Sequence, residues 1–136
     1  MAIIGDAAEM ARGLPDVVEG ERRGRLTWYV DGKAFAWDRP FTKADIKRFG
    51  DSVPPEGPIV AVRVADLAEK AAVLAASSNA VFTIPHFEGY AAILIQLEAV
   101  TKKELGELII DAWLACAPPR LADAYVQAED RRRHKA

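Results

Sequence analysis

The stretch Ala80-Val-Phe-Thr-Ile-Pro-His-Phe-Glu-Gly-Tyr-Ala-Ala-Ile-Leu-Ile-Gln-Leu-Glu-Ala-Val100 decides the fold of this chain. Two apolar runs flank a segment that holds a proline, a histidine, two aromatic residues and a glycine. Such runs on either side of a turn-forming segment are typical of paired antiparallel strands, so the stretch predicts a long β-hairpin. Its tip, residues 85–90, carries one of the two histidines of the chain.

Three further strands are expected upstream. Residues 25–30 and 33–37 are joined by Asp31-Gly32, which supplies the positive φ angles of a two-residue type I′ turn. Residues 59–64 are predicted as another strand, because every second residue is valine. Five strands joined largely by hairpins predict a largely antiparallel sheet.

The clearest predicted helix follows the capping box Thr101-Lys-Lys-Glu104 and ends before Pro118. Its apolar residues recur at helical spacing on one face: Leu105, Leu108, Ile109, Ala112, Trp113 and Cys116. The other predicted helices cover about residues 3–12, 43–49, 66–76 and 120–128. Residues 129–136, almost all charged, are predicted as a disordered tail.

These elements predict an α+β domain of two layers at residues 1–128, with helices mainly on one face of the sheet. The alternation along the strands leaves the opposite face at least partly open. That face is expected to carry Thr27, Tyr29, Ala61, Arg63, Ala92, Leu94 and Gln96.

Composition restricts the setting and the partners. The single cysteine, Cys116, allows no intramolecular disulfide, and the start of the chain lacks the features of a signal peptide. No apolar run is long enough for a membrane span, so a cytoplasmic protein is expected. The net charge is −2, but residues 20–63 carry nine basic and six acidic side chains, an excess of +3.

Four segments together resemble the MmcQ/YjbR-like family. They are Leu14-Pro-Asp-Val-Val-Glu-Gly20, Asp31-Gly-Lys-Ala-Phe-Ala36, Phe82-Thr-Ile-Pro-His-Phe-Glu-Gly-Tyr90, and Asp111-Ala-Trp113 with Ala117-Pro-Pro-Arg-Leu121. The resemblance implies a small α+β fold related to the frataxin-like one. It also implies DNA binding by two β-hairpin wings, which here would be residues 25–37 and 81–97.

If the chain binds double-stranded DNA, basic side chains must meet the phosphates. The candidates gather around the first hairpin: Arg22, Arg23, Arg25, Lys33 and Arg39. The alternative is a small-ligand or protein-interaction module that uses the open sheet face and the tip at residues 85–90, with His86, Phe87 and Tyr90 as contacts. The sequence does not indicate an oligomeric state.

No enzyme activity, cofactor or metal is expected. His86 has no visible nucleophile beside it, and its ring is expected to bond a backbone group and so hold the hairpin tip. Cys116 lies on an apolar helix face and is expected to pack in the core. Glu104, Glu107 and Asp111 share a helix face, which is typical of a solvated surface more often than of a metal site.

Overall fold

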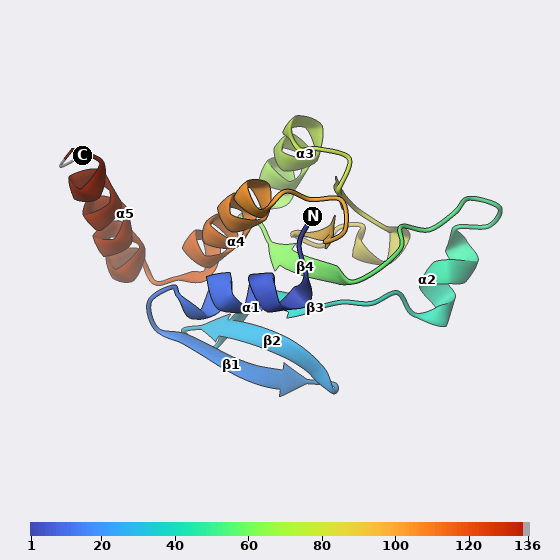
Figure 1. Cartoon of the computed structure of the whole chain (residues 1–136), viewed down its shortest axis with the longest axis horizontal. Coiled ribbons are helices and arrows are strands. Elements are labelled where there is room, and N and C mark those ends of the chain that lie inside the picture. The colour runs from blue at the N-terminus through green and yellow to red at the C-terminus, as the bar shows by residue number, and fades with distance from the viewer. Residues whose placement is uncertain (135–136) are drawn as a thin grey trace.

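The centre of the protein is an antiparallel sheet of six strands of unequal length, in the order β1-β2-β3-β4-β6-β5 (Figure 1). This computed structural model describes residues 1–134. The strands are β1 (Val17–Arg22), β2 (Arg25–Val30), β3 (Lys33–Asp38), β4 (Ile59–Arg63), β5 (Val81–Phe82) and β6 (Ala92–Gln96). The α+β class and the antiparallel pairing predicted from the sequence are confirmed.

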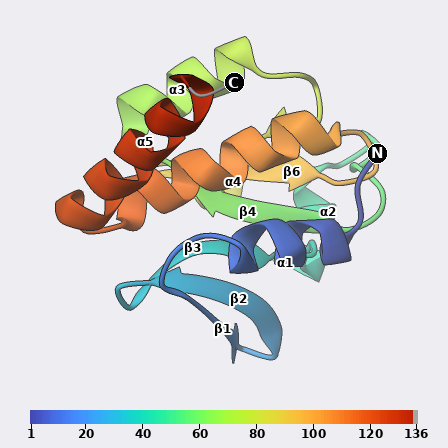
Figure 2. The same cartoon turned by 60° about the vertical axis from the view of Figure 1, so that its left-hand side comes forward.

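Helices lie mainly on one face of this sheet. Figure 2 shows α4 lying along the sheet beside α1, with α3 and α5 beyond it. The helices are α1 (Ile4–Arg12), α2 (Lys43–Arg48), α3 (Leu67–Ala76), α4 (Lys102–Cys116) and α5 (Pro119–His134), with a 3₁₀ helix η1 (Pro85–Phe87). Among these described elements, none is both long and apolar enough to cross a bilayer.

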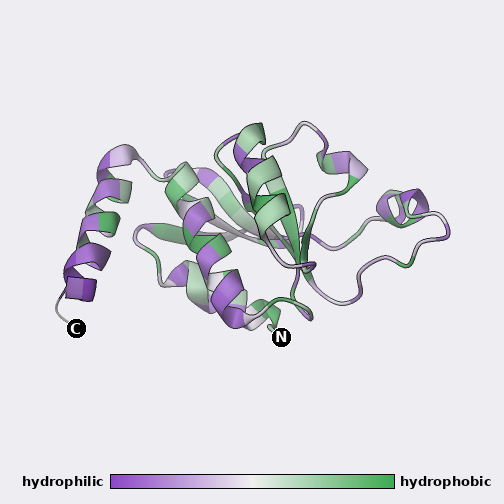
Figure 3. Ribbon diagram, turned by 90° about the horizontal axis from the view of Figure 1, so that it is seen from above, coloured by the Kyte–Doolittle hydropathy of each residue, from purple (hydrophilic) through white to green (hydrophobic). Residues whose placement is uncertain are grey.

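The main core forms where α4 meets the sheet. The predicted apolar face of α4 is buried, and Trp113 packs in one cluster with Trp28, Val62 and Ile93. Both indoles are also hydrogen-bonded: Trp28 donates to Glu19 Oε1 (2.9 Å) and Trp113 donates to the carbonyl of Pro15 (3.1 Å). In Figure 3 the strands in the interior are largely hydrophobic, while α5 is largely hydrophilic.

The opposite face of the sheet is more covered than the sequence predicted, although Tyr29, Arg63 and Gln96 there are only half-buried. Ala61, Ala92 and Leu94 are fully buried there. They form a second, smaller core with Ile59, Ile84 and Phe87, and four partly buried aromatic residues pack against it: Trp37, Phe41, Phe49 and Phe82. The aromatic residues come from β3, from the segments that flank α2, and from β5. Coverage of this face therefore depends on connections that fold back over the sheet.

The predicted long hairpin at residues 80–100 is only partly correct. β5 has two residues, which pair with Leu94 and Ile95 of β6. The chain between the two strands forms η1, and the side chain of Phe87 is buried in the second core. Pro85 begins η1, where its missing N–H costs nothing, whereas in a paired strand it would remove a ladder hydrogen bond.

The sheet has six strands instead of the predicted five, because β1 was not expected. β1 pairs with β2 through a two-residue turn, Arg23-Gly24, with φ angles of 54° and 74°. Both angles are those of a type I′ turn. The burial pattern of β1 is that of an exposed edge strand, and its residue Val18 is largely exposed.

The C-terminal helix is longer than predicted. α5 continues through residues 129–134 of the segment that was expected to be disordered. An ion pair one turn apart, between Arg132 and Glu129 at 3.1 Å, supports this extension. Residues 135 and 136 of that predicted tail lie outside the described residues.

Candidate functional site

A cleft with a volume of about 480 Å³ opens on the second face of the sheet. Three segments enclose it: the tip of the β1–β2 hairpin, the end of β3 with the chain leading into α2, and η1 with the turn that follows. We call it the basic cleft. It is lined by Arg22, Arg23, Arg25, Thr27, Trp37, Asp38, Arg39, Pro40, Phe41, Thr42, His86, Phe87 and Tyr90. The residues proposed for DNA and for a small ligand therefore share one site, with the exception of Lys33.

Three arginines at the β1–β2 tip are available to a ligand. Arg22 and Arg23 are exposed, and neither forms an ion pair within residues 1–134. Arg25 is also exposed and meets Asp38 only at 3.8 Å. Asp38 is the sole acid among the described residues that line the cleft. Burial raises the pKa of Asp38, against the opposing effect of Arg25. The cleft thus has an excess of positive charge.

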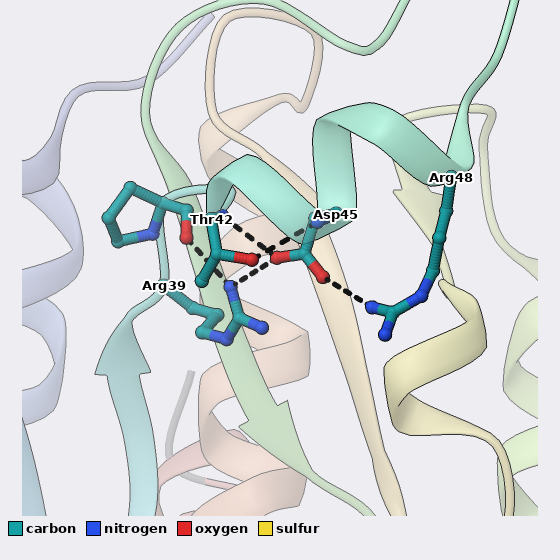
Figure 4. Close-up of polar contacts among 5 residues, drawn as sticks. Arg39, Thr42, Asp45 and Arg48 are labelled. Atoms are coloured by element: carbon teal, nitrogen blue, oxygen red, sulfur yellow. Dashed lines mark hydrogen bonds and ion pairs between the residues drawn. The ribbon is translucent and has the colours of Figure 1, made fainter.

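Arg39 lines the cleft but is occupied by structural contacts. Its Nη1 donates to Asp45 Oδ2 at 2.9 Å and to the carbonyl of Pro40 at 2.7 Å (Figure 4). Its guanidinium also lies 5.4 Å from the centre of the Phe87 ring. Since Asp45 offsets its charge, Arg39 connects β3, α2 and η1 and contributes less to anion binding than the hairpin arginines do.

Asp45 fixes the position of α2, which begins beside the cleft. Its carboxylate accepts the backbone N–H of Thr42 at 2.9 Å and lies 3.5 Å from Arg48, and the Thr42 hydroxyl accepts the N–H of Asp45 in return (Figure 4). This is a capping box. Burial tends to raise the pKa of Asp45, but the hydrogen bonds from Thr42 and Arg39 outweigh it and lower that pKa.

Lys33 does not belong to the cleft, which corrects the predicted set. It lies beside the Asp31-Gly32 turn and pairs with Val30 at one end of the β2–β3 ladder. The cleft lies toward the other end of that ladder, where Thr27 pairs with Trp37. The β1–β2 hairpin therefore presents Arg22, Arg23 and Arg25 to the cleft, and of the basic residues in the predicted hairpin at residues 25–37 only Arg25, which the two hairpins share, lines it.

Aromatic side chains form the apolar part of the cleft: Trp37, Phe41, Phe87 and Tyr90. Tyr90 is 36% exposed, although its ring is held on several sides. The Phe87 ring meets it edge-on at 5.4 Å, and the Trp37 ring lies 6.3 Å away. Arg63 lies over the Tyr90 ring at 5.2 Å and donates to its hydroxyl at 3.3 Å. The cleft therefore presents a fixed, accessible aromatic ring next to a basic rim.

His86 does not hold the tip at residues 85–90 in place, contrary to the expectation from the sequence. Its side chain is exposed at the cleft and, across the part of the chain that the structure describes, makes no hydrogen bond. Lys70 of α3 holds the segment instead: its Nζ donates to the carbonyls of Phe87 (2.6 Å) and Tyr90 (2.8 Å). Burial lowers the pKa of Lys70, and Glu88 opposes this effect.

Replacing Lys70 by methionine is expected to destabilise the protein by about 1–2 kcal/mol, because two carbonyls lose a charged donor while the apolar stem is kept. Urea unfolding measures this change. Lys103→Met on the exposed side of α4 is the matched control, with an expected change within about 0.5 kcal/mol. Equal stability of the two variants would show that Lys70 does not hold η1.

Two other candidate groups from the sequence, Cys116 and Glu104, take part in structural contacts. Cys116 is buried, as predicted, and burial raises the pKa of its thiol, which disfavours the reactive thiolate. Glu104 accepts the N–H of Ser78 at 3.0 Å. No group of three or more histidine, cysteine or acidic residues among residues 1–134 is arranged to hold a metal ion.

Comparison with known proteins gives relatives and a fold neighbour. Uncharacterized protein Rv2570 of Mycobacterium tuberculosis and uncharacterized protein Mb2600 of Mycobacterium bovis are each 41% identical to this chain over 129 residues. The match covers 93% of this chain and 97% of each relative. The crystal structure of Deinococcus radiodurans protein DR2400, with its DUF419 domain, superposes with a TM-score of 0.56 at 16% identity, over 84% of this chain and 78% of that one. This likeness shows a shared fold. No protein-family model matches the chain.

Proposed function

The chain belongs to the family of the mycobacterial protein Rv2570, and we propose that it is a non-enzymatic domain that binds nucleic acid by its phosphates. The observation that carries this proposal is the rim of the basic cleft. Arg22, Arg23 and Arg25 gather on one hairpin tip beside a single half-buried acid, Asp38. Guanidinium groups bind phosphate oxygens with two parallel hydrogen bonds, so three of them along one edge suit a chain of phosphates.

The resemblance to the MmcQ/YjbR-like family supports the same proposal. The two wings would be the β1–β2 hairpin and the connection between β5 and β6, which meet at the basic cleft. DNA, including the double-stranded form, is the partner that this resemblance implies. A cytoplasmic location fits such a partner.

Titration with short DNA at several salt concentrations tests the proposal. Each phosphate contact releases counterions, so affinity must fall steeply as salt rises from about 50 to about 200 mM. Three to four contacts would give a slope of log K against log salt of about −3 for duplex DNA. If DNA fails to bind at the lowest salt, or binds with an affinity that salt leaves unchanged, the proposal is wrong.

A small phosphorylated ligand is the second candidate. The observation that favours it is the concave shape of the basic cleft, whose volume of about 480 Å³ lies in the usual range of small-molecule sites. A mononucleotide that binds as tightly as a DNA strand does would favour this candidate, since the strand's further phosphates would then add nothing.

A further inference from the structure

The basic cleft combines two features that duplex DNA would not use together. Its rim is basic, which suits any nucleic acid backbone, but its apolar part is aromatic: Trp37, Phe41, Phe87 and Tyr90. In a duplex each base is stacked on its neighbours, and its flat face cannot reach a protein ring unless the base is flipped out. An unpaired base has a free face that stacks on aromatic side chains.

Tyr90 is placed to stack with such a base. Tyr90 borders the cleft, and 36% of the surface of this residue is exposed. Phe87, Trp37 and Arg63 hold the ring, and Lys70 holds the backbone carbonyl of the same residue at 2.8 Å. A ring that is ordered before binding loses little entropy when a ligand stacks on it.

The basic rim and the aromatic part of the cleft also line one continuous space. Arg25 of the rim and Tyr90 both line the same space of about 480 Å³. A base in contact with Tyr90 can thus keep its own phosphate or the next one near the hairpin arginines. Asp38, the acid in this lining, lies next to Arg25 at 3.8 Å, which leaves Arg22 and Arg23 as the less compensated charges.

We propose that the basic cleft binds single-stranded nucleic acid in preference to duplex, with an unpaired base on Tyr90 and the neighbouring phosphates on Arg22, Arg23 and Arg25. This inference rests on the proposed function and adds the form of the nucleic acid. Phosphate contacts alone would serve both forms, so the preference comes from the aromatic part of the cleft.

Calorimetric titration of the full chain with three short DNA probes tests the inference: a thymine strand, its duplex with adenine, and a strand of the same length without bases. The thymine strand is expected to bind about tenfold or more tighter than either of the others, as stacking of one or two bases would give. Equal affinity for the strand and the duplex, or for the strands with and without bases, would overturn it. Either result leaves salt-dependent phosphate binding intact, whereas failure of every probe at low salt removes both proposals.

Variants at Tyr90 make the test specific. Tyr90→Ala is expected to weaken binding of the thymine strand about tenfold and to leave the baseless strand unchanged. Tyr90→Phe is the matched comparison, because it keeps the ring and loses the hydroxyl with its contact from Arg63, and it is expected to keep more affinity for the thymine strand than Tyr90→Ala does. The inference fails if Tyr90→Ala, folded by circular dichroism, binds the thymine strand normally. The comparison of the three DNA probes uses the unaltered protein and does not depend on any variant.

Discussion

A protein with Arg22, Arg23 and Arg25 all replaced by alanine is expected to bind a DNA strand at least about 100-fold more weakly at low salt, since each arginine contributes about one charge-assisted contact. The slope of log K against log salt should also decrease in magnitude by about 2, the value for three lost contacts to a single strand. All three side chains are exposed at a hairpin tip, so the fold should be unaffected. Calorimetry or fluorescence titration measures both quantities.

The matched control removes the same charge elsewhere. Lys33, Lys103 and Arg120 are exposed side chains on β3, α4 and α5, and none lines the basic cleft. Their combined replacement by alanine should change affinity less than about threefold, the residual effect of net charge on steering. If this control loses as much affinity as the cleft variant, binding depends on overall charge and the site assignment is wrong.

Asp45→Ala is expected to cost about 3 kcal/mol of folding free energy, the largest effect on stability among our predictions. The side chain of Asp45 is 1% exposed, and its loss removes the capping-box partner that accepts the N–H of Thr42 while leaving Arg39, only 16% exposed, without its anion. Asp51→Ala, an exposed acid just beyond α2, should change stability by less than about 0.5 kcal/mol. Urea unfolding compares the two.

The effect should depend on pH in a defined direction. The pKa of Asp45 is lowered in the folded protein, so its carboxylate stabilises the fold fully above the unfolded-state pKa of about 3.9. That contribution is lost as pH falls from about 4 through the folded-state pKa. The difference in stability between the original protein and Asp45→Asn should therefore be constant near neutral pH and shrink below about pH 4. A difference that persists unchanged at pH 2 would contradict the ionic role of Asp45.

Asp45→Asn also separates stability from binding. The substitution leaves an amide that can still accept the N–H of Thr42 but no longer offsets the charge of Arg39. DNA affinity should then rise about two- to fivefold while stability falls, because one more positive charge faces the phosphates. A parallel fall in both would mean that α2 only maintains the shape of the cleft.

Local patterns allowed the sequence to predict most of the fold. The Asp31-Gly32 turn and the apolar face of α4 depend on residues close in sequence, and both were predicted correctly. β1 was missed because it is an edge strand with glycine and charged residues, and its turn has Arg23 where asparagine or aspartate is usual. The pair Arg23-Gly24 between two short runs of residues was the feature of the sequence that could have indicated this turn.

The site could be predicted only in part. The arginines and the aromatic tip residues were each recognised, but nothing in their sequence spacing indicated that segments about 60 residues apart enclose one cleft. Lys70 was missed because the alanine-rich sequence around it gave no indication of a functional side chain. It does share a helical face with Val73 and Leu74 at i+3 and i+4. Which carbonyls it holds depends on how η1 folds back, and this is a property of the tertiary structure.

Backbone amide chemical shifts during titration with a short thymine strand test the central claim most directly. We expect the largest changes at residues 22–27, 37–42 and 86–90, the three segments that enclose the basic cleft. The Asp31-Gly32 turn and α5 should show little change, since neither lines it. Changes concentrated in those two places, or no change at any segment at low salt, would contradict the assignment of the basic cleft as the nucleic-acid site.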